Sequence, residues 1–261
     1  MEPNEPAKMA TEKKYFTMLE NHPEVFTTLA HTLGLPPSIT FHDIYSFSPP
    51  ALTHIPRPCL ALIAIIPLTP SWALDRQSED ARLGDPKTYY HGNSNPSSSA
   101  PIIWFKQTIG DACGSYALLH CSINGPAASL IHPGSTLDQI RKDAAPLPRE
   151  ERAELLYDNK AFEEAHQSVA AMGDTAEPRD RSVGLGQHFV GYVKANGRLW
   201  ELEGSREGPL DRGELGDDED VLSPKALELG LGRIIKLEHE SGGQDLRFSC
   251  IAMALKDEQS E

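Results

Sequence analysis

The stretch HFVGYVKANGRLWELEG, residues 188–204, predicts a β-hairpin. Asn196-Gly197 separates two runs in which apolar and polar residues alternate, and this dipeptide is the strongest short-range signal for a two-residue turn between antiparallel strands. Elsewhere, strand-like and helix-like segments follow one another irregularly. We therefore expect an α+β domain with a largely antiparallel sheet.

The register of this hairpin places two polar side chains near each other. With the turn at Asn196-Gly197, Ala195 lies opposite Arg198, and Val190 then lies opposite Glu203. His188 is two residues from Val190 on the same face, so it becomes a diagonal neighbour of Glu203. Such neighbours have Cα atoms about 7–8 Å apart, within reach of long side chains. The sequence thus predicts an imidazole close to a carboxylate.

The remaining segments predict further strands and helices around this hairpin. The run CLALIAIIPL, residues 59–68, is continuously apolar, which is typical of a central strand buried on both faces. Strands are also expected within residues 39–47 and 246–255. Helical spacing begins at Leu19, is broken by Pro23 and ends at Gly34. Other helices are expected from Cys113 to Asn124-Gly125, two or three times within 134–166 with Ser135 as an N-cap, and over 223–240 with two weakening glycines. GELGDDED, residues 213–220, is expected to be an acidic turn.

Composition limits the classes of partner. The 261 residues carry a formal net charge of −14, which argues against nucleic acid or an anionic membrane and leaves a basic protein partner open. The N-terminus has no apolar segment of the kind a signal peptide needs, and the longest apolar run is too short to span a bilayer. The four cysteines are too sparse for a disulfide framework. We expect reduced thiols and a cytoplasmic protein, with the nucleus as a second compartment.

Cys113 lies in the stretch QTIGDACGSYALLHCSING, residues 107–125, at the expected start of a helix. The helix dipole and unpaired N–H groups there favour a thiolate, and the small flanking residues leave room for a substrate carbonyl. Gln107, together with the Cys113 N–H, could donate hydrogen bonds to an oxyanion. A structural cysteine is the alternative, because cysteine is among the most buried residue types.

His188 favours the catalytic alternative for Cys113. A carboxylate such as Glu203 that orients an imidazole, which deprotonates a thiol, is the arrangement that nucleophilic catalysis needs. The alternative is that neither residue is catalytic. Considered alone, His188 would be a strand-end histidine that hydrogen-bonds the backbone, and Glu203 would be a solvated strand residue. Cysteines and histidines show no spacing of metal ligands, so neither a metal nor another cofactor is expected. The other histidines are interpreted as ordinary: His22, His31, His42, His54, His91, His120, His132, His166 and His239.

At these residues the sequence resembles the ubiquitin carboxyl-terminal hydrolase family of cysteine proteases, in its short, single-domain form. QTIGDACGS is similar to that family's oxyanion and nucleophile motif, and HFVGYVKANGRLWELEG to its histidine-to-acid hairpin. LENHPEVFTTLAHTLGL, FHDIYSF, IPRPCLALIAIIPLT, GSTL, EERAELL and LRFSCIAMAL follow in the family's order. The resemblance covers roughly residues 15 to 256.

The resemblance implies that Cys113 is the nucleophile, His188 the general base, Gln107 the oxyanion donor and Glu203 the orienting acid. It also implies a central, mostly antiparallel six-stranded sheet flanked by helices, with a papain-like core, a knotted backbone and a crossover loop over the active site at 165–186. Residues 13–261 would form the catalytic domain, after a flexible tail at 1–12 and with a flexible loop at 91–101.

The activity so implied is hydrolysis of amide or thioester bonds after the C-terminal glycine of ubiquitin, with small or unfolded leaving groups favoured, by a monomer. Two alternatives remain, namely substantial activity on NEDD8 and a catalytically impaired ubiquitin-binding protein. The second rests on two departures from the family pattern. Glu203 stands where the family usually has Asp, and Asp111, an expected N-cap that would disfavour a nearby thiolate, stands where Asn is frequent.

Overall fold

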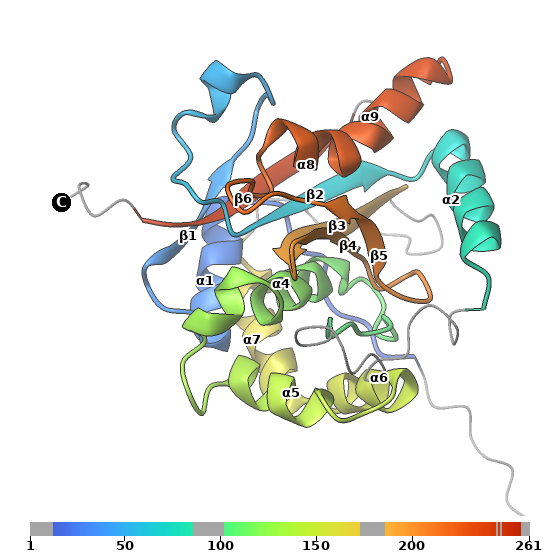
Figure 1. Ribbon diagram of the computed structural model, residues 1–261. Coiled ribbons are helices and arrows are strands. Elements are labelled where there is room, and N and C mark those ends of the chain that lie inside the picture. Colours follow the sequence, from blue (N-terminus) through green and yellow to red (C-terminus); the bar gives the residue numbers. More distant parts are fainter. Residues whose placement is uncertain (1–12, 86–101, 173–185, 244, 246, 257–261) are drawn as a thin grey trace, which may run out of the picture.

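The computed structural model describes residues 13–85, 102–172, 186–243, 245 and 247–256. These residues form an α+β fold around a six-stranded antiparallel sheet with the strand order β1-β6-β2-β3-β4-β5 (Figure 1). The expected fold class is therefore confirmed. The strands are β1 (Ile39–Asp43), β2 (Ala61–Pro67), β3 (Gln187–Ala195), β4 (Arg198–Leu202), β5 (Leu210–Glu214) and β6 (Ser249–Leu255).

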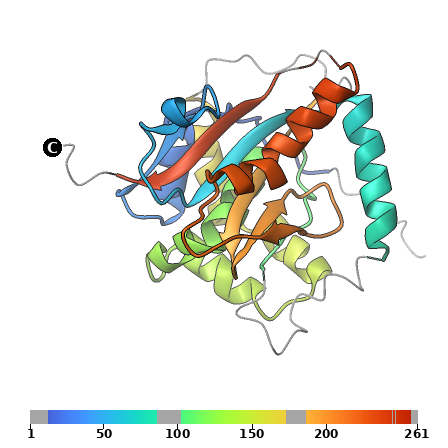
Figure 2. The same ribbon diagram turned by 45° about the horizontal axis from the view of Figure 1, so that its top comes forward.

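Helices cover both faces of the sheet. In Figure 1, α1, α4, α5, α6 and α7 lie on one face, and α8 and α9 lie on the other. The tilted view of Figure 2 shows α2 standing beside α9 at the β5 end of the sheet. The helices are α1 (Pro23–Leu33), α2 (Pro70–Leu83), α4 (Cys113–Ile123), α5 (Thr136–Ala144), α6 (Arg149–Tyr157), α7 (Lys160–Ala170), α8 (Pro224–Leu229) and α9 (Leu231–Glu240), with short 3-10 turns at Pro49–Leu52 and Pro126–Leu130.

The central strand β2 explains why two separate cores form. It pairs with β6 on one side and β3 on the other, as its uninterrupted apolar run predicted. Ile63 packs into the core beneath α1 and α4, whereas Leu62 and Ala64 pack into the core beneath α8 and α9. Because successive side chains of a strand point to opposite faces, both faces of β2 are buried.

The hairpin of β3 and β4 has the predicted register. Ala195 lies opposite Arg198, and Gly191 lies opposite Leu202. Asn196 and Gly197 have φ angles of 56° and 69°, as a tight turn between right-twisted strands requires. The hairpin prediction is therefore confirmed residue by residue.

Helix α4 is enclosed on all sides and lies directly on β3. Every residue of α4 after Cys113 is buried, so the helix has no solvent-facing stripe. A Cβ at Gly191 of β3 would lie 2.7 Å from the Cys121 sulfur, so this close approach requires glycine. The packing fixes the start of α4, which carries Cys113, against the strand that carries His188.

Several local predictions need correction. The N-terminal helix begins at Pro23 rather than near Leu19, because proline is well tolerated at the first helical position. The helix expected over 223–240 is two helices that meet at Gly230. The acidic turn expected over 213–220 begins later, because Gly213 and Glu214 belong to β5, and α2 was not predicted at all.

The crossover loop begins later than expected. Residues 165–170 belong to α7, whose Phe162, Ala165 and Val169 recur at helical spacing and are buried. The rest of the loop at 173–185, the tail at 1–12 and the loop at 91–101 lie outside the described residues, as do the connections on which a backbone knot depends. Within the described part of the chain, no helix is long and apolar enough to cross a membrane.

Candidate active site

Cys113 is the first residue of α4, with Ala112 as the N-cap. The helix begins here because Ala112 accepts the first intrahelical hydrogen bond, from the Tyr116 N–H, at 3.0 Å. The thiol is half-buried, whereas the other three cysteines, Cys59, Cys121 and Cys250, are buried. Cys113 therefore combines partial access with the electropositive end of a helix.

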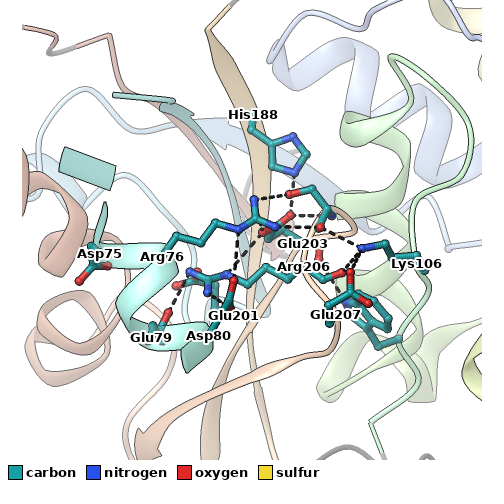
Figure 3. A network of polar contacts seen from close by, with 12 residues as sticks. Asp75, Arg76, Glu79, Asp80, Lys106, His188, Glu201, Glu203, Arg206 and Glu207 are labelled. Atoms are coloured by element: carbon teal, nitrogen blue, oxygen red, sulfur yellow. Dashed lines mark hydrogen bonds and ion pairs between the residues drawn. The ribbon is translucent and has the colours of Figure 1, made fainter. Parts of the chain in front are cut away.

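His188 and Glu203 meet as the hairpin register predicted. Nε2 of His188 lies 2.9 Å from Oε2 of Glu203 (Figure 3). The same carboxylate oxygen accepts a 2.7 Å hydrogen bond from the Ser205 N–H, and the Trp104 indole N–H donates to the Glu203 carbonyl at 3.1 Å. The acid is therefore fixed at both its side chain and its backbone.

The charges of Cys113 and His188 stabilise each other. Burial by itself raises the pKa of the Cys113 thiol, but the hydrogen bond and charge of His188, with the N–H groups of Phe189 and Gly114, hold that pKa below its ordinary value. Burial likewise lowers the pKa of His188, but Cys113 and Glu203 together raise it to about 10. Each charge therefore stabilises the other, which favours a thiolate beside an imidazolium.

Glu203 completes this arrangement as a carboxylate. Burial alone raises its pKa, yet the hydrogen bond and charge of His188, the side chain of Ser205 and the charge of Arg76 lower it to about 2. With the imidazolium between two anions, the ring is held by Glu203 at Nε2 and faces the thiol with its other side. The extra methylene of Glu relative to Asp does not prevent contact with His188.

Gln107 lies beside the acid-bearing segment. Its backbone N–H donates to the Gly204 carbonyl at 2.8 Å, and a Cβ at Gly204 would lie 2.6 Å from the Gln107 Cβ. The side-chain amide of Gln107 donates one hydrogen bond to the Ile109 carbonyl at 3.0 Å, which leaves its second N–H for an oxyanion. The structure thus brings Gln107 next to Glu203, and it brings Cys113 and His188 together.

Asp111 is not the N-cap that the sequence analysis expected. The N-cap is Ala112, whose side chain makes no capping hydrogen bond. Asp111 instead adopts a left-handed backbone with φ 58°, a conformation that Asn and Asp tolerate better than most residues. Its place in the motif is therefore explained by backbone conformation.

Sequence analysis missed a buried ionic network behind the acid, drawn in Figure 3. Arg206 is 2% exposed and pairs with Glu79 and Asp80 of α2 at 2.8 Å each. Arg212 of β5 pairs with Glu79 and, at 2.8 Å, with Glu201. Only the pair Thr69-Pro70, typical of an N-cap followed by a first helical residue, marked α2 in the sequence.

Two histidines that the sequence gave no reason to single out are buried and have uncharged hydrogen-bond partners. Nδ1 of His166 shares a 2.7 Å hydrogen bond with the Ser115 hydroxyl, and its Nε2 lies 2.8 Å from the Thr17 carbonyl. Nε2 of His120 accepts the Phe105 N–H at 2.9 Å. Neither faces the thiol, and within the described residues no cluster of three potential metal ligands occurs.

A thiol, an imidazole and a carboxylate in sequence, with the thiol at a helix N-terminus, form the constellation of a cysteine-dependent hydrolase. The comparisons with known proteins agree with that class. A family model described as "Ubiquitin carboxyl-terminal hydrolase, family 1" matches residues 16–234. The chain therefore belongs to the ubiquitin carboxyl-terminal hydrolase family 1.

Individual relatives cover most of the chain. It is 29% identical to Ubiquitin carboxyl-terminal hydrolase 3 of Arabidopsis thaliana over 249 residues, which span 95% of this chain and 97% of the relative. It is 31% identical to Ubiquitin carboxyl-terminal hydrolase YUH1 of Saccharomyces cerevisiae over 211 residues, or 79% and 82% of the two chains. The catalytic domain of Trichinella spiralis UCH37, solved bound to ubiquitin vinyl methyl ester, has the same fold, with a TM-score of 0.66, 20% identity and coverage of 94% and 97%.

Proposed function

We propose that this chain is a thiol hydrolase that cleaves the amide or thioester bond after the C-terminal glycine of ubiquitin. The observation that carries the proposal is the Cys113 thiol, whose pKa His188 lowers, next to an imidazole held 2.9 Å from Glu203. Membership of the family supports ubiquitin as the substrate, and so does the ubiquitin probe bound to the Trichinella spiralis neighbour.

In the first half of the reaction, the Cys113 thiolate attacks the carbonyl carbon of the terminal glycine. The new bond pushes an electron pair onto the carbonyl oxygen, where Gln107 and the Cys113 N–H stabilise the charge. When the tetrahedral intermediate collapses, the bond to the leaving group breaks, and the His188 imidazolium gives its proton to the leaving amine or thiol. A thioester between Cys113 and the glycine remains.

In the second half, His188 is neutral and acts as a base. It takes a proton from water, the hydroxide oxygen attacks the thioester, and the thiolate leaves as the free carboxyl group forms. Glu203 stabilises the imidazolium that forms again and holds the ring by its Nε2–H.

The C-terminal end of the substrate, which must enter the site, is flexible and carries few side chains. A groove that admits two glycines rejects side chains, so specificity arises from exclusion. The net charge of −14 favours association with a partner whose tail is basic. Small or unfolded adducts are expected to react faster than folded conjugates, and comparing turnover of a fluorophore reporter with that of a folded ubiquitin fusion tests this preference.

The central experiment is hydrolysis of a ubiquitin C-terminal fluorophore by the wild type and by Cys113→Ala. We expect complete loss of turnover in C113A, because no other group replaces the nucleophile. Cys250→Ala, which removes a buried thiol of β6, is the matched control and should retain activity. Ubiquitin vinyl methyl ester should add covalently to the wild type at Cys113 and leave C113A unmodified.

The same assays separate the alternatives. Equal turnover of a NEDD8 reporter would indicate a dual-specificity hydrolase, because the two substrates would then compete for one site. Tight ubiquitin binding without turnover or covalent capture would identify a non-catalytic ubiquitin-binding protein and would overturn the proposal.

The proposal also includes a reducing compartment, the cytoplasm or nucleus, because the described cysteines are free and the reaction needs a thiol. A monomer is expected, and sedimentation at micromolar concentration tests that expectation. Fractionation of cells that express the tagged chain tests the compartment.

A further inference from the structure

The two oxygens of Glu203 have different surroundings. Oε2 accepts hydrogen bonds from His188 and from the Ser205 N–H. Oε1 is buried and accepts no hydrogen bond from the described residues. A buried carboxylate oxygen without a hydrogen bond is costly unless positive charge lies close to it.

Two guanidinium groups supply that charge. Nε of Arg206 lies 3.5 Å from Oε1, and Nη1 of Arg76 lies 3.8 Å from it, as Figure 3 shows. These separations are too long for good hydrogen bonds, so both arginines act on Oε1 through charge. In a site where Glu203 is 4% exposed, such charges are weakly screened by solvent.

Arg76 is held in place by contacts on three sides. Its guanidinium donates to the Ser205 hydroxyl at 2.9 Å and to the Ser205 carbonyl at 2.8 Å. It also lies 5.2 Å from the ring centroid of Trp72, and it pairs with Asp80 one turn further along α2 at 3.7 Å. Its position is therefore set independently of Glu203.

Helix α2 holds Arg206 as well. Glu79 and Asp80 of that helix pair with Arg206 at 2.8 Å each. Glu79 is only 7% exposed, so the face of α2 toward the acid is built from charges rather than from apolar side chains. Apart from these ion pairs, α2 is covered mainly by α9 at its other side.

We propose that Arg76 of α2 is a positioning residue for the reaction, which keeps Glu203 charged and aimed at His188 through the second carboxylate oxygen. This inference rests on the proposed function of the Cys113 site. Arg206, which pairs with Glu79 and Asp80 of α2, also places positive charge near Oε1. Helix α2 therefore supports the catalytic triad, although none of the triad residues belongs to it.

Among the described residues, three charged groups and one neutral histidine face Glu203. His188 belongs to β3, Arg76 to α2, and Arg206 follows β4. His120 of α4 also senses the charge of Glu203, but burial lowers the pKa of His120 to about 3, so it is neutral. The side chain of Arg76 is 23% exposed, against 11% for His188 and 2% for Arg206, which makes Arg76 the best place for a substitution.

The arrangement also explains how Glu serves where relatives with the family motif have Asp. The longer side chain lets one oxygen reach His188 and the Ser205 N–H while the other lies between two arginines. A longer side chain has more rotamers to lose, and the fixed charges of Arg76 and Arg206 select one of them.

The test is a pair of measurements on Arg76→Gln. We expect kcat for the ubiquitin reporter to fall about tenfold with KM unchanged within about twofold, by analogy with metal sites, where outer-shell partners that orient a ligating histidine typically contribute 10- to 100-fold. We also expect the pH of half-maximal iodoacetamide alkylation of Cys113 to rise by about one unit, because loss of a positive charge disfavours the thiolate. Arg76→Lys, which retains the charge, should recover most of the pH shift.

Arg82→Gln is the matched control, because Arg82 lies on the same helix, is 74% exposed at its side chain and reaches Glu79 only at 4.0 Å. It should change neither measurement by more than about twofold. If R76Q melts below the assay temperature, Arg76→Met, which keeps the stem over Trp72, replaces it.

A double-mutant cycle that combines Arg76→Gln with Glu203→Gln decides whether Arg76 influences kcat through the charge of Glu203. If Arg76 acts through the Glu203 charge, R76Q should cost less than about twofold in the E203Q background. A full tenfold loss in that background, a rise in KM alone, or an unchanged alkylation profile would each overturn the proposal.

Failure of the proposed function gives a different result. If wild type does not hydrolyse the ubiquitin reporter, the proposed substrate is wrong, whereas the alkylation profiles of wild type, R76Q and R82Q still decide whether Arg76 influences the Cys113–His188 pair.

Discussion

His188 and His166 are both enclosed by protein, yet their imidazoles carry different charges at neutral pH. Burial is the main influence on both, and it lowers the pKa of His166 to about 4. The pKa of His188 is raised to about 10, because Cys113 and Glu203 outweigh the same effect of burial. The hydrogen-bond partners of His166 in the described chain are a hydroxyl and a carbonyl, and the charge of Glu163 offsets burial only in part.

The comparison shows that burial does not make a histidine catalytic. An uncharged partner set produces a neutral ring that joins α7 to α4 and to the N-terminal segment. Two anionic partners produce a charged ring that can hold a thiolate and give up a proton. The difference lies in the neighbours, which belong to distant parts of the sequence.

Replacement of His188 should have the largest effect. In His188→Gln we expect kcat/KM to fall by about 1,000-fold or more, because both the thiolate partner and the proton donor are lost. The alkylation midpoint of Cys113 should rise to the ordinary thiol range or above it. His239→Gln, on the exposed side of α9, is the control, and equal activity of H188Q and wild type would contradict the assigned role.

Replacement of His166 should affect stability instead. His166→Ala leaves the Ser115 hydroxyl and the Thr17 carbonyl without their partner and opens a cavity beside Phe16, so we expect a loss of about 3 kcal/mol. Urea unfolding measures this loss. The kcat of the folded fraction should stay within a few-fold of wild type, and a large fall in kcat at unchanged stability would contradict the distinction between the two histidines.

Acid should weaken the fold through the neutral histidines. The pKa values of His120 and His166 are lowered to about 3 and about 4, so the unfolded chain binds more protons than the native chain below about pH 6.5. The stabilisation of the native state by these two neutral histidines is fully present above pH 6.5 and is lost as the pH falls toward 4. We expect the free energy of unfolding to fall by about 2 kcal/mol per histidine from pH 7 to pH 5.

His188 should make the opposite contribution. The pKa of His188 is raised in the folded chain. Its contribution to the free energy of unfolding is therefore fully present below pH 6.5 and is lost as the pH rises through about 10. Urea unfolding of wild type, H166A and H188Q between pH 5 and 10 separates the two signs. A similar pH dependence in H166A and wild type at acidic pH would contradict the neutral state of His166.

The smallest expected effect concerns the length of the acid. Glu203→Asp should lower kcat by about threefold, because a shorter side chain cannot keep both the His188 contact and the position between Arg76 and Arg206. Steady-state kinetics with the ubiquitin reporter measures it. A large rise in kcat would mean that the natural Glu is a handicap and that the arginines do not favour its length.

The hairpin and its histidine–acid pair could be predicted because the information is local. Asn196-Gly197 sets the turn and with it the register of the two strands. Because side chains alternate between the faces of a strand, His188 and Glu203 then lie on the same face and meet. The start of α4 at Cys113 could likewise be predicted from the residues around it. The contact between Cys113 and His188 is not local, because no short-range pattern places α4 against β3; only the chemistry of the two residues and the family resemblance linked them in advance.

Helix α2 could not be predicted from hydrophobic periodicity, since the face it buries is ionic. Glu79 packs against Arg206 and Arg212, and a pattern of charges does not distinguish such a face from a solvated one. The arginines that surround Glu203 were missed for the same reason. Their partners become visible only when α2, β5 and the segment after β4 are placed side by side.

The close approach at Gly204 has a consequence for engineering this site. The residue after the acid supports the backbone of the oxyanion donor, through the 2.8 Å hydrogen bond from Gln107 and the absence of a Cβ. A library that varies position 204 to retune Glu203 would therefore also displace Gln107, so most of its members would be inactive for two reasons at once. Designers who wish to alter the acid and keep the oxyanion donor intact should vary the residues of α2 and leave that glycine unchanged.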